Sequence, residues 1–195
     1  MGSEFIRDVE VVDQPGIKDL TKPSQAQLRE LPKYLEPEYI RESILAMPEG
    51  SARILVMTLW YTGIRVSEAL GIRKQDLDVR NRAVRIRWLK SRHWAERYVP
   101  LHPEIAAILG VYTASKLSED RLFPFTRQRA YQICRRYVKC HPHQLRHSFA
   151  VHFLRSGGSL VELHKIMGHR RITTTQVYLN IVPSDIVGTL NKIRF

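Results

Sequence analysis

The sequence lacks long apolar runs, has few cysteines and has fewer acidic than basic residues. No stretch approaches about 18 uninterrupted apolar residues, and the N-terminus lacks the apolar core of a secretory signal. Both absences argue against a membrane-spanning or exported protein. The only cysteines, Cys134 and Cys140, stand six positions apart in a predicted helix and so on different faces. We therefore expect free thiols and a cytoplasmic protein.

A zinc site is the alternative use of the crowded residues Cys140, His141 and His143. We disfavour it, because adjacent ligands at the start of a helix rarely converge on one tetrahedral ion. The candidate site described below also has no cluster of metal-binding carboxylates beside it. We expect it to use neither a metal nor a cofactor.

The charge balance points to a polyanionic partner. There are 31 Lys and Arg against 19 Asp and Glu, which gives a formal charge of +12 and a pI near 10.0. Nucleic acid suits such a chain, although charge alone does not separate DNA from RNA or an anionic membrane. The length of 195 residues and the apolar fraction of 44% predict one main domain.

The N-terminal segment differs in composition from the rest. Residues 2–5, Gly-Ser-Glu-Phe, are typical of a vector-derived scar, and residues 6–31 are polar with Pro15, Gly16 and Pro23. We expect residues 1–31 to be scar and linker, and residues 32–195 to form the domain.

Apolar periodicity predicts the elements of this domain. Val84, Ile86 and Trp88 alternate with polar positions as in a half-buried strand, residues 98–101 are its expected returning partner, and Lys90 falls on the hairpin between them. Helices are expected over 38–47, 51–61, 66–71, 103–116, 127–138, 143–156, 160–167, 173–179 and 185–192. The predicted fold class is mainly α with a small antiparallel β-sheet, an α+β fold.

Four short motifs occur in a recognisable order. They are Thr62-Gly63-Ile64-Arg65-Val66-Ser67-Glu68-Ala69-Leu70, His143-Gln144-Leu145-Arg146-His147, Gly168-His169, and Tyr178 after the run Thr173-Thr174-Thr175. Together they resemble the catalytic domain of tyrosine recombinases, the phage integrase family, from about Pro32 to the C-terminus. The resemblance implies a tyrosine recombinase catalytic-domain fold. It also implies catalytic roles for Arg65, Lys90, His143, Arg146, His169 and Tyr178, with Glu68 in support.

The implied reaction is DNA breakage and rejoining without metal or ATP. Tyr178 would attack the scissile phosphorus to give a 3′-phosphotyrosyl bond and a free 5′-hydroxyl, and Lys90 would protonate the leaving oxygen. Two guanidinium forks, Arg65 and Arg146, suit the charge on the non-bridging oxygens. His169 would hydrogen-bond a phosphate oxygen, and Glu68 would orient His143 or an arginine.

Spacing places two of these residues together. His143 and Arg146 lie three apart on a predicted helix and so share a face, whereas we assign His147, one position further on, a structural role. Tyr178 costs roughly 4 kcal/mol to ionise at pH 7 from its free pKa of about 10, and neighbouring cations are expected to lower that cost.

Several alternatives stay open. The segment from Lys90 to Glu96 lacks the glycine and second lysine usual in the family, so Lys90 is alternatively a solvated hairpin residue. The function is alternatively that of a type IB topoisomerase or of an inactive DNA-binding module. The family's upstream core-binding domain is expected to be missing through truncation.

Double-stranded DNA is the expected partner. A C-terminal helix with an apolar stripe is expected to join protomers into a dimer or tetramer on DNA. The stripe consists of Ile186, Val187, Leu190 and Ile193.

Overall fold

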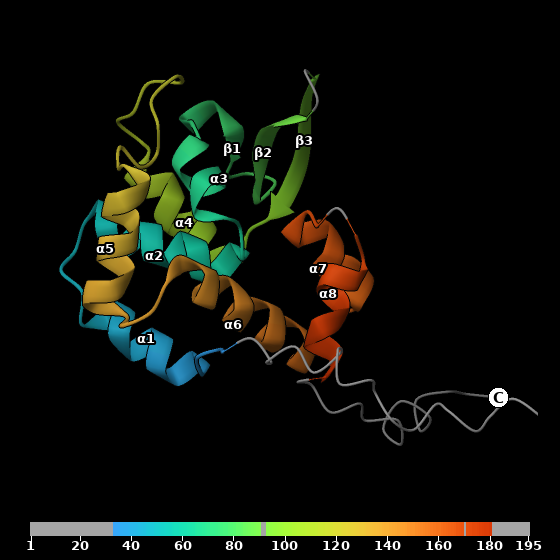
Figure 1. Cartoon of the computed structure of the whole chain (residues 1–195). Helices are drawn as coiled ribbons and strands as arrows, with labels where there is room; N and C mark the ends of the chain where they lie inside the picture. The colour runs from blue at the N-terminus through green and yellow to red at the C-terminus, as the bar shows by residue number, and fades with distance from the viewer. Residues whose placement is uncertain (1–32, 91–92, 170, 181–195) are drawn as a thin grey trace, which may run out of the picture. The chain divides into compact units, whose positions relative to one another are not determined.

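A computed structural model describes residues 33–90, 93–169 and 171–180, with side chains except at 89, 90, 93, 94 and 180. They belong to one compact unit, Leu31–Phe195. The elements (Figure 1) are α1 (Pro37–Leu45), α2 (Ser51–Thr62), α3 (Val66–Gly71), η2 (Lys74–Asp76), β1 (Leu77–Asp78), β2 (Ala83–Lys90), β3 (His93–Pro100), α4 (Pro103–Tyr112), α5 (Arg127–Tyr137), α6 (Pro142–Arg155), α7 (Leu160–Met167), α8 (Thr173–Gln176) and η3 (Val177–Asn180). The predicted α+β class is confirmed, and no described helix is long and apolar enough to cross a bilayer.

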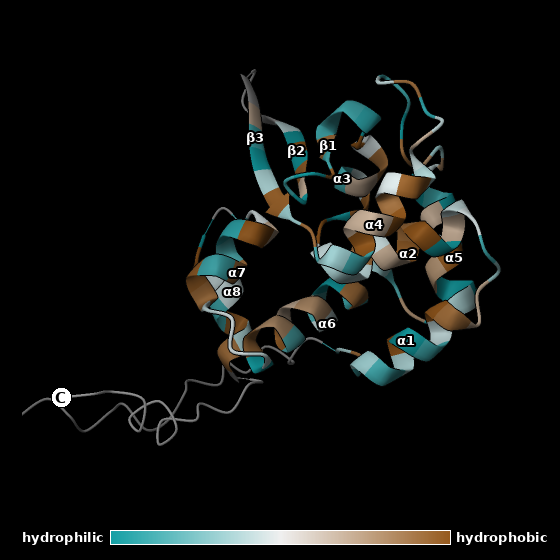
Figure 2. Ribbon diagram, turned by 180° about the vertical axis from the view of Figure 1, so that it is seen from behind, coloured by the Kyte–Doolittle hydropathy of each residue, from teal (hydrophilic) through white to brown (hydrophobic). Residues whose placement is uncertain are grey.

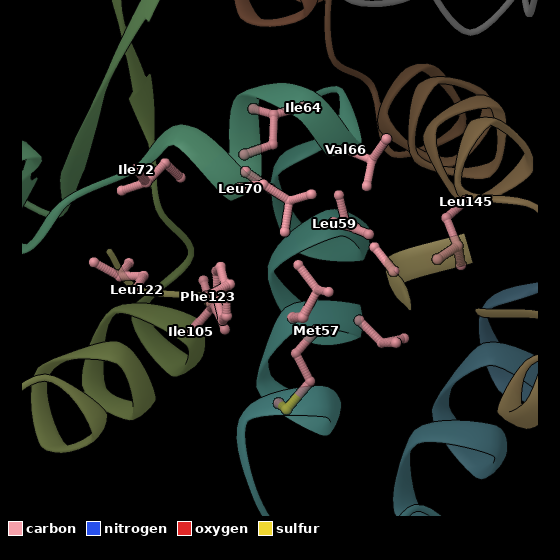
Figure 3. Packing of buried hydrophobic residues seen from close by; sticks show 14 of the residues in the cluster. Met57, Leu59, Ile64, Val66, Leu70, Ile72, Ile105, Leu122, Phe123 and Leu145 are labelled. Carbon is pink, nitrogen blue, oxygen red and sulfur yellow. The ribbon is translucent and has the colours of Figure 1, made fainter. Parts of the chain in front are cut away.

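Helix α2 is the centre of the main hydrophobic core. Its side chains are apolar almost all round, and helices α1, α3, α4, α5 and α6 pack around it. Figure 3 shows Leu59 of α2 among side chains from neighbouring elements, including Ile105 of α4, Leu145 of α6 and Phe123 from the segment before α5. In Figure 2 the outer faces of α1 and α5 carry the polar residues. The prediction of a helix over 51–61 is confirmed, and the helix is largely buried.

Most helix limits agree with the sequence pattern to within two residues, and α3 and α7 agree fully. The exceptions are α4, which ends at Tyr112 rather than at residue 116, and α8, which ends at Gln176 rather than at residue 179. After α4 the chain turns more tightly, because the N–H groups of Ala114 and Lys116 each donate to the carbonyl three residues back rather than four. The predicted helix over 185–192 lies outside the described residues.

The sheet is longer than the sequence suggested. Strand β2 pairs antiparallel with β3 from Ala83 opposite Pro100 to Lys90 opposite His93, and the short β1 pairs with the start of β2. Lys90 therefore lies on the hairpin, but as the last residue of β2 rather than between two shorter strands, because the backbone ladder continues through it. Its side chain is not among those described.

Two arginines of β2 are held by an acidic residue. Asp76 is 5% exposed, and its carboxylate accepts hydrogen bonds from the guanidiniums of Arg85 and Arg87 at 3.1 and 3.2 Å. Arg85 and Arg87 therefore have an acidic partner within the chain.

A second, smaller cluster lies at the other end of α6. There α7, α8 and η3 cover the later part of α6, and the buried members are Ala150, Val151, Leu163, Met167 and Tyr178. The expected single helix over 173–179 is instead α8 followed by the 3₁₀ turn η3. Tyr178 reaches this cluster from η3.

Candidate active site

Two helix C-termini bring their carbonyl groups to one arginine. Helix α2 is followed by Gly63 and α7 by Gly168, both with left-handed backbone at φ 61° and 62°. Glycine tolerates this conformation, which ends each helix and leaves carbonyls free to accept hydrogen bonds. Arg146 of α6 donates to the carbonyl oxygens of Gly63 and Met167. The partial negative charge of both helix ends favours a cation there.

Arg65 meets Arg146 at the same carbonyl. Its Nη1 lies 3.5 Å from the oxygen of Met167, to which Nη2 of Arg146 donates at 2.8 Å. Glu68 holds Arg65 from the other side, since its carboxylate accepts from the backbone N–H and from Nη1 of Arg65 at 2.8 and 3.1 Å. The two guanidiniums thus lie beside the same carbonyl oxygen, as a shared anion site requires.

The two arginines differ in exposure. The side chain of Arg65 is 37% exposed, whereas Arg146 is 4% exposed. Arg65 can therefore meet a ligand directly, and Arg146 contributes its charge from below. Burial and then the charge of Arg65 lower the pKa of Arg146 to about 10, so it remains protonated at pH 7.

A third arginine, Arg97 of β3, joins the site although no sequence motif indicated it. Its guanidinium binds both carboxylate oxygens of Glu68 at 3.0 and 2.9 Å and donates to the carbonyl of Ile166 at 3.0 Å. Glu68 thus orients Arg65 and Arg97, and no hydrogen bond to His143 is found among the described contacts. Burial acts to raise the pKa of Glu68, but the hydrogen bonds and charge of Arg97 and Arg65 hold it below its ordinary value. The carboxylate is therefore ionised.

Two candidate histidines surround the arginines. His143 is exposed at the start of α6, and burial, Arg146 and Arg127 lower its pKa. His169 follows α7, and burial together with Arg146 and Arg65 lowers its pKa to about 4. The positive charge of the arginines thus acts on both rings. His169 is neutral at pH 7.

Nδ1 of His169 lies 2.8 Å from the hydroxyl of buried Thr175, which is also 3.2 Å from Nδ1 of His164. Because a hydroxyl carries one proton, it donates to one of these rings and accepts from the other.

Tyr178 is buried, and its hydroxyl is hydrogen-bonded to His147, the histidine for which the sequence indicated only a structural role. Tyr178 is 2% exposed, and its hydroxyl lies 2.7 Å from Nδ1 of His147. Burial raises the pKa of Tyr178 to about 12, although Arg146 acts in the opposite direction. Arg146 thus acts on the pKa of Tyr178 in the expected direction, but burial outweighs this single charge.

The described residues contain no group of three or more His, Cys, Asp or Glu that could hold a metal ion. Cys134 and Cys140 are both buried free thiols, and burial raises the pKa of each to about 12. Neither thiol is suited to nucleophilic chemistry.

The chain belongs to the phage integrase family, whose model matches residues 26–184. The resemblance seen in the sequence is confirmed. A tyrosine recombinase of Pseudothermotoga lettingae is 31% identical over 182 residues, which cover 85% of this chain and 62% of that relative. The chain therefore spans less than two thirds of the length of that relative.

Solved structures share the fold. The crystal structure of XerA recombinase superposes with a TM-score of 0.69 at 26% identity, covering 89% of this chain and 68% of that one. XerH recombinase, solved bound to its difH substrate before cleavage, gives a TM-score of 0.63 at 20% identity, covering 85% and 54%. Mainly helical domains with a small sheet are thus common to all three.

Proposed function

We propose that this chain is the catalytic part of a site-specific recombinase that cuts and rejoins DNA through Tyr178. The observation that carries the proposal is the meeting of Arg65 and Arg146 at the carbonyl of Met167, close enough to Tyr178 for its pKa to respond to Arg146. A protein with a formal charge of +12 in which two guanidiniums converge is suited to a backbone phosphate.

In the first chemical step the phenolic oxygen of Tyr178 bonds to phosphorus, and the bond from phosphorus to the 5′-oxygen breaks. Arg65 and Arg146 stabilise the charge that develops on the non-bridging oxygens, and His143 donates a hydrogen bond to them. Neutral His169 can donate from Nε2 when its Nδ1 accepts from Thr175. The bound 3′-phosphate stores the energy of the broken bond, so a 5′-hydroxyl reseals the strand without ATP.

Lys90 is the proposed proton donor to the leaving 5′-oxygen. Its place at the end of β2, opposite His93, puts it at the tip of a hairpin. A 5′-bridging sulfur, which needs little protonation, should restore cleavage by Lys90→Ala. Absence of rescue would indicate another acid.

Double-stranded DNA is the proposed partner, supported by the basic charge and by the DNA-bound state of the XerH neighbour. We propose residues 32–195 as the catalytic domain, supported by the compact unit Leu31–Phe195. Assembly into a dimer or tetramer is proposed to use the apolar stripe of residues 186–193, which lie outside the described residues. Deleting 181–195 should then abolish assembly on DNA without abolishing binding.

The test is covalent trapping on a nicked suicide duplex, in which the cleaved end diffuses away. The wild-type protein should form an adduct that resists denaturation, whereas Tyr178→Phe should bind DNA but form none. Tyr98→Phe is the matched control, because Tyr98 is 62% exposed on β3 and should trap normally. Trapping should persist in a chelator; strict metal dependence would favour a nuclease instead.

Trapping does not separate a recombinase from a type IB topoisomerase. Similarity to a protein named as a tyrosine recombinase supports the recombinase function, so we expect recombination of a two-site substrate. Relaxation of supercoiled DNA without exchange would support the topoisomerase.

A further inference from the structure

The hydroxyl of Tyr178 has one side-chain hydrogen bond among the described contacts, and its partner is His147. The oxygen and Nδ1 are 2.7 Å apart, and the ring centroids lie 5.8 Å apart with their planes tilted by 51°. Because Tyr178 is 2% exposed, water has little access to the phenol. The proton that leaves Tyr178 on attack must therefore pass to a group already in contact with it.

His147 is placed there by the periodicity of α6. It lies four residues after His143 and one after Arg146, so the same stretch of helix faces both the arginines and η3. Burial, followed by His143 and Arg146, lowers the pKa of His147. The ring is therefore neutral at pH 7, and a neutral imidazole has one nitrogen free to accept a proton.

We propose that His147 is the base that takes the phenolic proton of Tyr178 during cleavage and returns it during rejoining, a role that rests on the proposed function. As the oxygen of Tyr178 bonds to phosphorus, its proton moves to Nδ1, while the leaving 5′-oxygen takes a different proton from its own acid. In rejoining, the 5′-hydroxyl attacks phosphorus and returns its proton to that acid, the bond from phosphorus to Tyr178 breaks, and Nδ1 returns the other proton to the phenolate.

Bound DNA raises the basicity of His147. The charged and titratable groups around His147 are Arg146 and His143 on α6, His169 after α7, and Tyr178 on η3. In the unliganded chain the positive charge of Arg146 opposes protonation of the ring. A phosphate bound between Arg65 and Arg146 offsets that charge and raises the basicity of His147 where the nucleophile must lose its proton.

The first test needs no DNA. Nitrogen-15 NMR distinguishes the two neutral tautomers of histidine, and His147→Asn identifies the signal. The proposal requires Nδ1 to be the acceptor and Nε2 to carry the proton, and Tyr178→Phe should shift the Nδ1 resonance. A ring protonated on Nδ1 would donate to the phenol and would overturn the proposal, whatever the outcome of the trapping experiment.

The second test is the single-turnover rate of adduct formation. His147→Asn keeps an acceptor near the position of Nδ1 but is no base, so it should preserve the hydrogen bond and DNA affinity while slowing cleavage by about 10² to 10⁴-fold. It should also remove the rise of the rate with pH that comes from neutralising His147. A wild-type rate or an unaltered pH profile would overturn the proposal.

His152→Gln is the matched control on the same helix. His152 bonds to the carbonyl of Leu35 at 2.9 Å, away from Tyr178, so its loss should leave the cleavage rate unchanged. His147→Gln guards against misfolding of the first variant, since thermal unfolding must be cooperative in at least one of them. Failure of the wild-type protein to form any adduct would refute the proposed function itself, whereas the tautomer measurement concerns His147 alone.

Discussion

The two ends of helix α6 belong to hydrophobic clusters of very different size. At its beginning, Leu145 packs into the large core around α2, the helix that ends at Gly63. Towards its end, the helix contributes Ala150 and Val151 to a cluster that has five buried members among the described residues, and Tyr178 is one of them. Arg146, the arginine proposed to bind phosphate, is therefore held by both regions, whereas Tyr178, the proposed nucleophile, is held by the smaller one, where local opening is expected to cost less.

Arg146 joins these two regions, so removing it should have the largest effect. Arg146→Ala removes the side-chain donor of the Gly63 carbonyl and leaves the carbonyl of Met167 with only the longer contacts to Arg65 and Arg97, at a cost of about 2–4 kcal/mol in unfolding free energy. Loss of the guanidinium should also reduce cleavage at least about 10³-fold. Urea unfolding and single-turnover trapping measure the two effects. Equal activity in Arg146→Lys would show that a point charge suffices and that the fork is unimportant.

A pair of matched leucines sharpens the comparison. Leu59 of α2 and Leu163 of α7 are 1% and 0% exposed, and each truncation to alanine should cost about 2–5 kcal/mol locally. Leu59→Ala should lower the global free energy of unfolding by this amount. Leu163→Ala should instead speed amide hydrogen exchange in α7 with a smaller global loss. Identical exchange patterns in the two variants would mean that both clusters unfold as one.

Acidification should act first on the histidines beside the arginines. His169 has an ordinary pKa near 6.5 when unfolded and about 4 in the folded chain. The unfolded state therefore binds the proton first as pH falls, and stability should decline between pH 6.5 and 4. Unfolding curves across this window should show a shallower decline for His169→Asn. An unchanged slope would mean that other groups account for the acid sensitivity.

The smallest predicted effect concerns the start of α7. Ser159 accepts a hydrogen bond from the backbone N–H of Glu162, whose carboxylate accepts from the backbone of Ser159, and together they cap the helix. Ser159→Ala should cost about 1 kcal/mol in thermal unfolding. Ser43→Ala in the interior of α1 is the comparison away from a helix start. Equal losses in both variants would argue against the capping contribution.

Local sequence signals predicted much of this fold. Glycines at 63 and 168 mark the ends of α2 and α7, and the capping pair Ser159 and Glu162 marks the start of α7. These elements follow from interactions within a few residues. The length of the β2–β3 hairpin was underestimated because the alternation of apolar residues fades after Trp88, while backbone pairing continues to Lys90.

The contacts of the site were harder to predict because they join distant elements. Arg97 shares the inward face of β3 with buried Val99, and an arginine facing inward requires a carboxylate, so a signal for its pairing was present. The structural role expected for His147 followed from its position one residue after Arg146. Its spacing of four from His143, however, also places it on a common face with that histidine. Its contact with Tyr178 depends on how η3 packs on α6, and local sequence does not encode that packing.

The most direct test of the account identifies the residue that carries the DNA. The wild-type adduct on a nicked duplex can be digested with nuclease and trypsin, and the modified peptide sequenced by mass spectrometry. We expect a nucleotide linked through phosphate to Tyr178, in the peptide that begins at Ile172. A nucleotide attached to any other side chain would contradict it.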